Sequence, residues 1–271
     1  MRPTAIRRTA VAATVMSLAL LTAACGSDGD DKDGGKAAGS SAQPSEKGAD
    51  KGADKGADQA SAKALSAAEL EKVSLAQGDV KGHKITKAGP ADAVDAKDVT
   101  ADKAACDVFG DLVMGAKAGS PAASTQRKVT SEPKKGADKD TADPEEAFKA
   151  AFDITTTLTT LASYDGKGAE EALASLRTAA TECAGGFALN VAGEKQKVTK
   201  IAEEQVEGGE EAAAWTVSVE SDGNKMTFKL TALRQGTTLA SFSSMNLAAM
   251  DGGGDYDLPT AVIGAQAKKL A

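Results

Sequence analysis

The stretch 215–230, WTVSVESDGNKMTFKL, decides the fold. Apolar side chains occupy every second position on each side of Asp222-Gly223-Asn224. Such alternation is typical of a strand with one buried face, and a turn of this composition joins the two strands of a hairpin. The stretch therefore predicts an antiparallel hairpin with one apolar face.

The hairpin is part of a longer run of predicted strands. Phe187, Leu189 and Val191 alternate with small or polar residues, and 237–245 follows a second turn at 234–236. Strands that follow each other through short turns form an antiparallel meander, in which one face is apolar and the other faces water. We expect this meander to form the second half of the folded domain.

Segments with helical patterns lie on both sides of the meander. Their apolar residues recur at helical spacing, and several have start signals such as the capping box at Ser66–Glu69 and the proline at Pro259. The predicted helices cover 66–77, 101–116, 143–164, 168–184 and 259–270. This order predicts an α+β fold: N-terminal helices followed by an antiparallel β-meander and a C-terminal helix, with the helices packed on one sheet face.

The segment 143–164 carries two conflicting signals. Asp143-Pro144 followed by Glu145 and Glu146 is a good helix start, because acids and proline suit the first turn. The middle of the segment, 155–160, is rich in threonine, and β-branched residues are weak helix formers. The apolar spacing leads us to predict a helix.

The N-terminus has the three parts of an export signal. Basic residues in 1–8 precede an uncharged apolar stretch, Thr9–Thr22, which is too short to span a bilayer as a helix. A run of small residues then ends at Cys25. Residues 1–24 are therefore predicted to be a signal peptide, with the cleavage site between Ala24 and Cys25.

The run Leu21-Thr22-Ala23-Ala24-Cys25 resembles the lipobox of bacterial lipoproteins, with Thr22 where the commonest pattern has leucine. The resemblance implies lipid attachment at Cys25 and anchoring to the cell membrane on its extracytoplasmic face. Two or three acyl chains hold a protein at a membrane essentially permanently. The alternative is an ordinary secretory signal whose cleavage site happens to adjoin a cysteine.

Residues 25–64 are predicted to be a lipidated cysteine plus a disordered tether. From Gly26 to Ala64 there is no aromatic residue, Val, Ile, Leu or Met, and Lys-Gly-Ala-Asp occurs three times in tandem over 47–58. Such a stretch cannot bury enough apolar surface to fold, and its reach as a coil is ~35 Å. The rest, 65–271, is expected to form a single domain with an exposed polar loop near 119–143.

Composition excludes several classes of function. The formal net charge of −7 makes nucleic acid an improbable partner. A single histidine and three cysteines exclude multi-histidine and cysteine-rich metal sites. No catalytic or dinucleotide motif is present, and the acidic run Asp251–Asp257 lacks the spacing of an EF-hand. We therefore expect no enzyme activity, cofactor or metal; the alternative is an envelope hydrolase that uses paired carboxylates, whose pairing is spatial and leaves no sequence motif.

Cysteine numbers predict one disulfide. If Cys25 carries lipid, Cys106 and Cys183 remain as an even pair in an oxidising compartment. Both lie on predicted helices, so a bond between them would join the two helices. Two buried free thiols are the alternative.

Three stretches carry a further resemblance: 176–187 with its cysteine and following glycines, the acidic turn at 206–212, and the hairpin at 233–239. Together they are similar to the extracellular sensor-like domain of mycobacterial Ser/Thr protein kinases and related actinobacterial lipoproteins. The resemblance implies an α+β domain with a cleft and a ligand- or partner-binding role. This chain has one possible disulfide where the kinase domain has two.

The sequence thus predicts a non-catalytic ligand-binding or sensor-like lipoprotein. The alternative is a structural or protein-interaction lipoprotein of the envelope, so the partner is either a small molecule or an envelope protein. Tyr164 and Tyr256 adjoin Gly/Asp-rich loops and are the candidate cleft residues, whereas Trp215 lies on an apolar strand face and is expected in the core.

Overall fold

The computed structural model describes residues 62–92, 94–133, 150–250 and 254–271, which all belong to one compact unit. The predicted signal peptide, Cys25 and the tether up to residue 61 lie outside the described residues. Within the described residues, no helix is long and apolar enough to cross a membrane.

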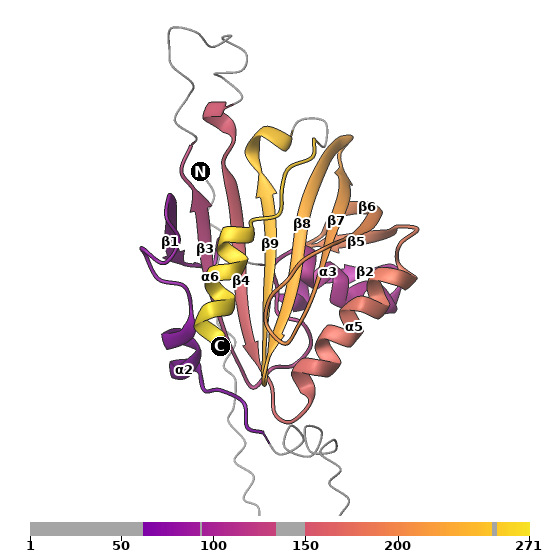
Figure 1. Cartoon of the computed structure of the whole chain (residues 1–271). Helices are drawn as coiled ribbons and strands as arrows, with labels where there is room; N and C mark the ends of the chain where they lie inside the picture. Colours follow the sequence, from indigo (N-terminus) through magenta and orange to yellow (C-terminus); the bar gives the residue numbers. More distant parts are fainter. Residues whose placement is uncertain (1–61, 93, 134–149, 251–253) are drawn as a thin grey trace, which may run out of the picture. The chain divides into compact units, whose positions relative to one another are not determined.

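The described domain is built on one antiparallel sheet of nine strands (Figure 1). The order across the sheet is β1-β3-β4-β9-β8-β7-β6-β5-β2. The strands are β1 (His83–Lys87), β2 (Val99–Ala101), β3 (Ala123–Ser131), β4 (Thr155–Ser163), β5 (Phe187–Val191), β6 (Glu194–Glu204), β7 (Glu211–Ser221), β8 (Asn224–Gln235) and β9 (Thr238–Asn246).

The predicted meander is confirmed, because β5 to β9 pair in chain order. Ser221 pairs with Asn224 across the β7–β8 turn, where Asp222 and Gly223 both have positive φ, 50° and 80°. Two positive φ values define the primed turn whose twist matches that of the strands. The Asp-Gly signal therefore fixes the register of the central hairpin.

Four α-helices lie wholly within the described residues: α2 (Ala67–Val73), α3 (Asp107–Val113), α5 (Gly168–Glu182) and α6 (Thr260–Leu270). Three short 3-10 helices join them: η1 (Ala96–Asp98), η2 (Ala104–Cys106) and η3 (Leu247–Ala249). The capping box at Ser66–Glu69 is formed at the start of α2, and the α+β class with its C-terminal helix is confirmed.

The helices cover both faces of the sheet, not the one face that the sequence led us to expect. The disulfide face is the face covered by α3 and α5, and its core includes Leu230 and Leu239. The α6 face is covered by α2 and α6, and its core includes Leu233 and Phe242. Successive side chains in a strand point to opposite faces. The middle strands therefore carry apolar residues on both faces, so both faces are buried.

The predicted helix over 143–164 is wrong in its second half. Thr155–Ser163 is β4, which lies between β3 and β9, and the described residues 150–152 before it are helical. Branched side chains fit the pleated surface of a buried strand, and this preference overrides the helical spacing of the apolar residues. The predicted helix start at Asp143–Glu146 lies outside the described residues.

The predicted polar loop near 119–143 also contains a strand. Ala123–Ser131 forms β3, which pairs with β1 and β4. Its side chains are polar, but Val129 is fully buried on the α6 face. The edge strands β1 and β2 were not expected either, and residues 134–143 of the loop are outside the described residues.

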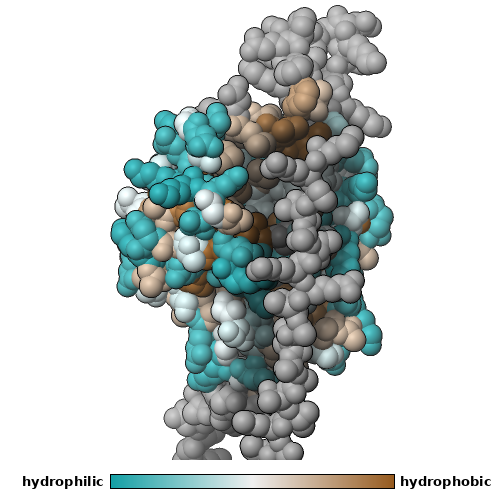
Figure 2. Space-filling view, turned by 180° about the vertical axis from the view of Figure 1, so that it is seen from behind, coloured by the Kyte–Doolittle hydropathy of each residue, from teal (hydrophilic) through white to brown (hydrophobic). Residues whose placement is uncertain are grey.

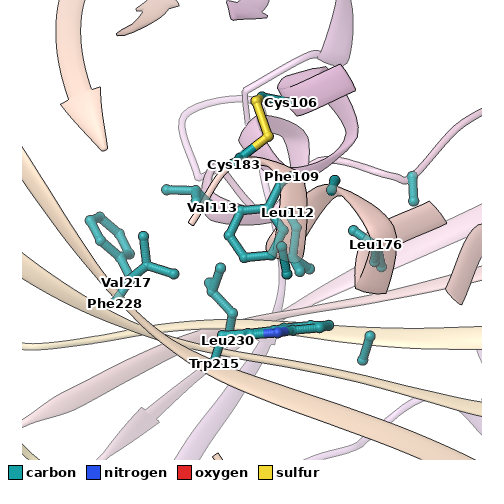
Figure 3. Packing of buried hydrophobic residues seen from close by; sticks show 14 of the residues in the cluster. Cys106, Phe109, Leu112, Val113, Leu176, Cys183, Trp215, Val217, Phe228 and Leu230 are labelled. Carbon is teal, nitrogen blue, oxygen red and sulfur yellow. A yellow bond between two sulfur atoms is a disulfide. The ribbon is translucent and has the colours of Figure 1, made fainter. Parts of the chain in front are cut away.

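The core of the disulfide face surrounds a bond between Cys106 and Cys183, which confirms the predicted pair (Figure 3). The Cα atoms of the two cysteines are 6.0 Å apart, and the bond joins η2 to the end of α5. Trp215 lies in this core as expected, with its ring centroid 5.4 Å from that of Phe109 in an edge-to-face contact. The bond and the aromatic pair hold α3 against the sheet.

Candidate functional site

A hollow lies on the disulfide face where the sheet extends beyond the end of α3. We call it the methionine groove, and its volume is about 390 Å³. Small-molecule sites in proteins range over ~300–1,000 Å³. The residues that line it are Ala91, Asp92, Val113, Met114, Lys128, Thr156, Leu158, Gln196, Met226, Phe228, Ser243 and Met245.

Methionine is concentrated in this groove. Of the four methionines among the described residues, Met114, Met226 and Met245 line the groove, and all three are half-buried. Methionine is unbranched and flexible, so it adapts to differently shaped apolar partners and is over-used at such binding surfaces. The lining can therefore hold an apolar group without a fixed shape.

The polar groups of the groove lie among the apolar ones. Lys128 Nζ is 2.7 Å from Asp92 Oδ1, and Asp92 Oδ2 accepts a hydrogen bond from Gly89 N. The ammonium group and the backbone N–H hold the pKa of Asp92 below its ordinary value. The Oε1 atom of Gln196 is buried without a hydrogen-bond partner. A buried acceptor in this state favours an occupant that offers a donor.

The end of α3 is fixed to the sheet by three hydrogen bonds. Ser243 Oγ donates to Val113 O at 2.7 Å, and Gly115 O accepts from Gln126 Nε2 at 2.7 Å and from Thr160 Oγ1 at 2.8 Å. Gln126 Nε2 also contacts Thr160 Oγ1 at 2.9 Å. These bonds position Met114 over the groove.

Asp111 is a half-buried carboxyl group on the same helix. Burial, with a smaller contribution from the charge of Asp107, raises its pKa to about 7. Asp111 does not line the groove. Its protonation therefore bears on the stability of α3 and not on contact with an occupant.

Neither candidate tyrosine lines the methionine groove. Tyr164 is buried in the core, where its hydroxyl donates to Ala118 O at 2.5 Å and burial raises its pKa. Its burial contradicts the prediction of a cleft rim. Tyr256 lies on the α6 face, where its hydroxyl donates to Ser244 O at 2.5 Å and accepts from Lys229 N. The structure therefore does not bring the two tyrosines together.

A charged cluster surrounds Lys229 on the α6 face. The side chain of Lys229 is only 4% exposed, and its Nζ lies 2.5 Å from Glu204 and 2.8 Å from Asp255. Thr216 hydrogen-bonds to Glu204, and the Tyr256 ring centroid is 5.9 Å from the ammonium nitrogen. The ammonium group is thus fully paired, which suits a structural role in fastening residues 255–256 to the sheet.

A second, larger hollow of about 480 Å³ lies beside α6. The one carboxylate in its lining, Asp79, already pairs with Lys269 Nζ at 2.7 Å, and the other charged lining residues are Lys81 and Lys268. Within the described ranges, no group of three or more His, Cys, Asp and Glu residues could hold a metal ion. The methionine groove is therefore the better candidate site.

Exposed apolar side chains gather near the open end of the groove. Phe152, Leu247 and Met250 are 41%, 45% and 38% exposed, and they lie just before β4 or just after β9. These strand ends adjoin, because Leu247 N donates to Ile154 O at 2.9 Å. Figure 2 shows hydrophobic surface in the upper part of the molecule, the end at which these segments lie in Figure 1.

The chain enters the domain at the opposite end of the sheet. Leu65 N donates to Ser163 Oγ at 2.8 Å, and Gly166 N donates to Ala62 O at 2.8 Å. Ser163 is the last residue of β4, whereas Thr156 in the groove is near its start. At ~3.3 Å per strand residue, Thr156 and Ser163 are about 23 Å apart along β4.

Sequence reasoning missed the groove residues. The alternation of apolar residues predicts correctly that Met226 and Phe228 lie on the apolar side of a strand. That pattern does not show whether a helix covers such a side chain or whether it lines a groove. The available signal was the number of methionines: the domain has few, and most lie on segments that the sheet brings together.

No protein-family model and no curated protein matches the chain. Among solved structures, the crystal structure of the extracellular domain of PknH from Mycobacterium tuberculosis is similar to it. The match covers 77% of this chain and 95% of that domain, at 12% sequence identity and a TM-score of 0.46.

Proposed function

We propose that this chain is an extracytoplasmic lipoprotein, anchored to the cell membrane through Cys25, whose domain binds an apolar or amphiphilic small molecule without transforming it. The observation that carries the binding role is the methionine groove, with its flexible apolar lining and the unpartnered Oε1 of Gln196. An amphiphile with an apolar body and one N–H or O–H donor satisfies both features.

The binding role is tested first with 1-anilinonaphthalene-8-sulfonate, a fluorescent amphiphile, and the whole chain carrying Cys25→Ser. Met245→Asp introduces a negative charge into the groove, and we expect the affinity for the probe to fall at least about tenfold, because burying an unpaired charge is costly and the carboxylate repels the sulfonate of the probe. Met250→Asp is the matched control, since Met250 is exposed outside the groove. Equal loss in both variants contradicts binding in the groove.

Native mass spectrometry then addresses the natural ligand. Protein isolated from its own envelope is expected to carry excess mass that disappears on denaturation, and Met245→Asp is expected to lose that mass. The anchor is tested separately by fractionation of cells that express Cys25→Ser, in which we expect the protein to leave the membrane fraction. Retention of the variant in the membrane fraction contradicts the lipid anchor.

The exposed Phe152, Leu247 and Met250 favour a second function, docking of an envelope protein. A photocrosslinking residue at position 247 is expected to capture a discrete partner in cells, whereas one at exposed Glu182 on α5 captures none. This outcome, together with an unchanged melting temperature in the presence of small amphiphiles, favours the protein-interaction role over the small-molecule role.

A further inference from the structure

We propose that Met114, Met226 and Met245 form an all-thioether site for a soft monovalent cation, Cu(I). The proposal shares its location with the proposed small-molecule site but does not depend on an organic occupant. It starts from the placement of three thioethers at one hollow in a domain that has few methionines.

The topology explains how two of the three side chains meet. Lys229 pairs with Ser244 across β8 and β9, so Phe228 and Met245 are the next residues outward on the two strands. Met226 is two residues from Phe228 and points to the same face. Diagonal neighbours of this kind have Cβ atoms roughly 7–8 Å apart, within reach of long side chains.

The third thioether comes from above the sheet. Met114 is the C-cap residue of α3, and Ser243 Oγ holds the carbonyl of the preceding Val113 over the same strands. The three methionines thus converge from β8, β9 and α3. Each side chain has three rotatable bonds and can turn its sulfur toward a common centre.

The donor set selects the cation. Thioethers are soft, neutral ligands that favour Cu(I), whereas divalent Mg²⁺, Ca²⁺ and Mn²⁺ need oxygen donors. The carboxylate nearest the hollow, Asp92, already pairs with Lys128 at 2.7 Å, so it is not a free oxygen ligand. The apolar neighbours Val113, Leu158 and Phe228 limit the access of water.

The first test uses silver(I), which is a soft cation and is redox-inert. Ag(I) is added to the whole chain carrying Cys25→Ser, and native mass spectrometry counts the bound ions. This background removes the one cysteine outside the disulfide, because a free thiol would compete for the metal. We expect one bound Ag(I) per chain. Met226→Leu and Met245→Leu are each expected to weaken binding about tenfold or more, the range that loss of a supporting group alone causes at metal sites.

Cu(I) itself is measured by competition with the chromophoric chelator bathocuproine disulfonate, under ascorbate rather than a thiol reductant. We expect the same order of affinities as with Ag(I). Met250→Leu is the matched control, because it also loses a thioether but lies outside the groove. Circular dichroism and the melting temperature of each variant confirm that the fold is retained.

The outcomes separate the two proposals. Leucine keeps the apolar volume of methionine, so the Met→Leu variants retain the anilinonaphthalene probe if the small-molecule site is correct. No stoichiometric Ag(I) and Cu(I), or equal losses in Met245→Leu and Met250→Leu, overturns the thioether site. If Ag(I) and Cu(I) bind but the anilinonaphthalene probe does not, the result supports the thioether site and contradicts the small-molecule role.

Discussion

At the scale of single residues, Gly115 determines how closely α3 approaches the sheet. Its φ is +70°, and a Cβ atom built on it would lie 2.9 Å from Leu158 Cδ1. Left-handed backbone costs a non-glycine residue about 1–3 kcal/mol, and the contact with Leu158 adds to that cost. The carbonyl of this glycine also accepts the hydrogen bonds from Gln126 and Thr160.

We therefore predict that Gly115→Ala lowers the free energy of unfolding by about 2 kcal/mol and weakens probe binding in the groove. Gly119→Ala is the control: its φ is +62°, but nothing lies within 4 Å of the added atom. Urea denaturation of both variants measures the difference. A cost at Gly115 no larger than that at Gly119 shows that the contact with Leu158 is unimportant.

Asp111 makes stability depend on pH. Its pKa in the folded protein is about 7, above that of an unfolded aspartate at about 3.9, so the folded state binds more protons between these values. The contribution to stability is fully present below about pH 4 and is lost as the pH rises through 7.

Asp111→Asn is therefore expected to raise the melting temperature at pH 8 and to change it little at pH 4. Because the carboxyl is only half-buried, we expect a gain of about 1 kcal/mol at pH 8 and not the full value of the pKa shift. Glu182→Gln, at an exposed position, is the control. An equal effect of Asp111→Asn at both pH values contradicts the assignment.

At the scale of elements, α3 cannot be stable alone. It spans seven residues, whereas isolated helices shorter than ~12–15 residues are marginal in water. The bond from Cys106 to Cys183 fixes its start to α5, and Ser243 fixes its end to β9. The groove therefore depends on a helix that is held at both ends by other elements.

The double variant Cys106→Ala/Cys183→Ala is predicted to lower the free energy of unfolding by about 2–4 kcal/mol. It is also expected to weaken the probe affinity of the groove, because Met114 belongs to the helix whose start the disulfide holds. Ser243→Ala, which releases only that end, is expected to weaken probe binding with a stability loss of about 1 kcal/mol. Unchanged probe affinity in both variants contradicts the role of α3 in shaping the groove.

The elements that could be predicted from sequence are those with local signals. The Asp222-Gly223 turn and the capping box at Ser66–Glu69 specify structure within a few residues, and the structure contains both. The strand β4 could not be predicted this way, because its identity depends on burial between β3 and β9. The groove residues depend on where α3 stops, which is set by contacts distant in sequence.

At the scale of the whole molecule, the first and last helices of the described domain, α2 and α6, are joined by hydrogen bonds. Gln266 of α6 is fully buried, and its side chain donates to Val73 O at 2.8 Å and accepts from Leu75 N at 3.2 Å. These bonds join the C-terminal helix to the last residue of α2 and to Leu75 just beyond it. They cover the α6 face, on which Phe242 and Leu161 are buried.

Gln266→Leu is predicted to cost about 1–3 kcal/mol of unfolding free energy, because it leaves the buried N–H of Leu75 and the part-buried C=O of Val73 without the bonds from Gln266. Gln205→Leu, at an exposed position, is the control and is expected to change stability little. Chemical denaturation gives both values. A neutral effect of Gln266→Leu shows that the two backbone groups find other partners.

The entry of the chain at Ser163 and the groove near Thr156 lie toward opposite ends of β4. A force applied between an occupant of the groove and the residues that precede the domain therefore acts along β4. Hydrogen bonds in an antiparallel pair are perpendicular to the strands, so those between β4 and β9 share such a load in shear instead of opening one after another. The domain is thus expected to be mechanically stiff along this axis.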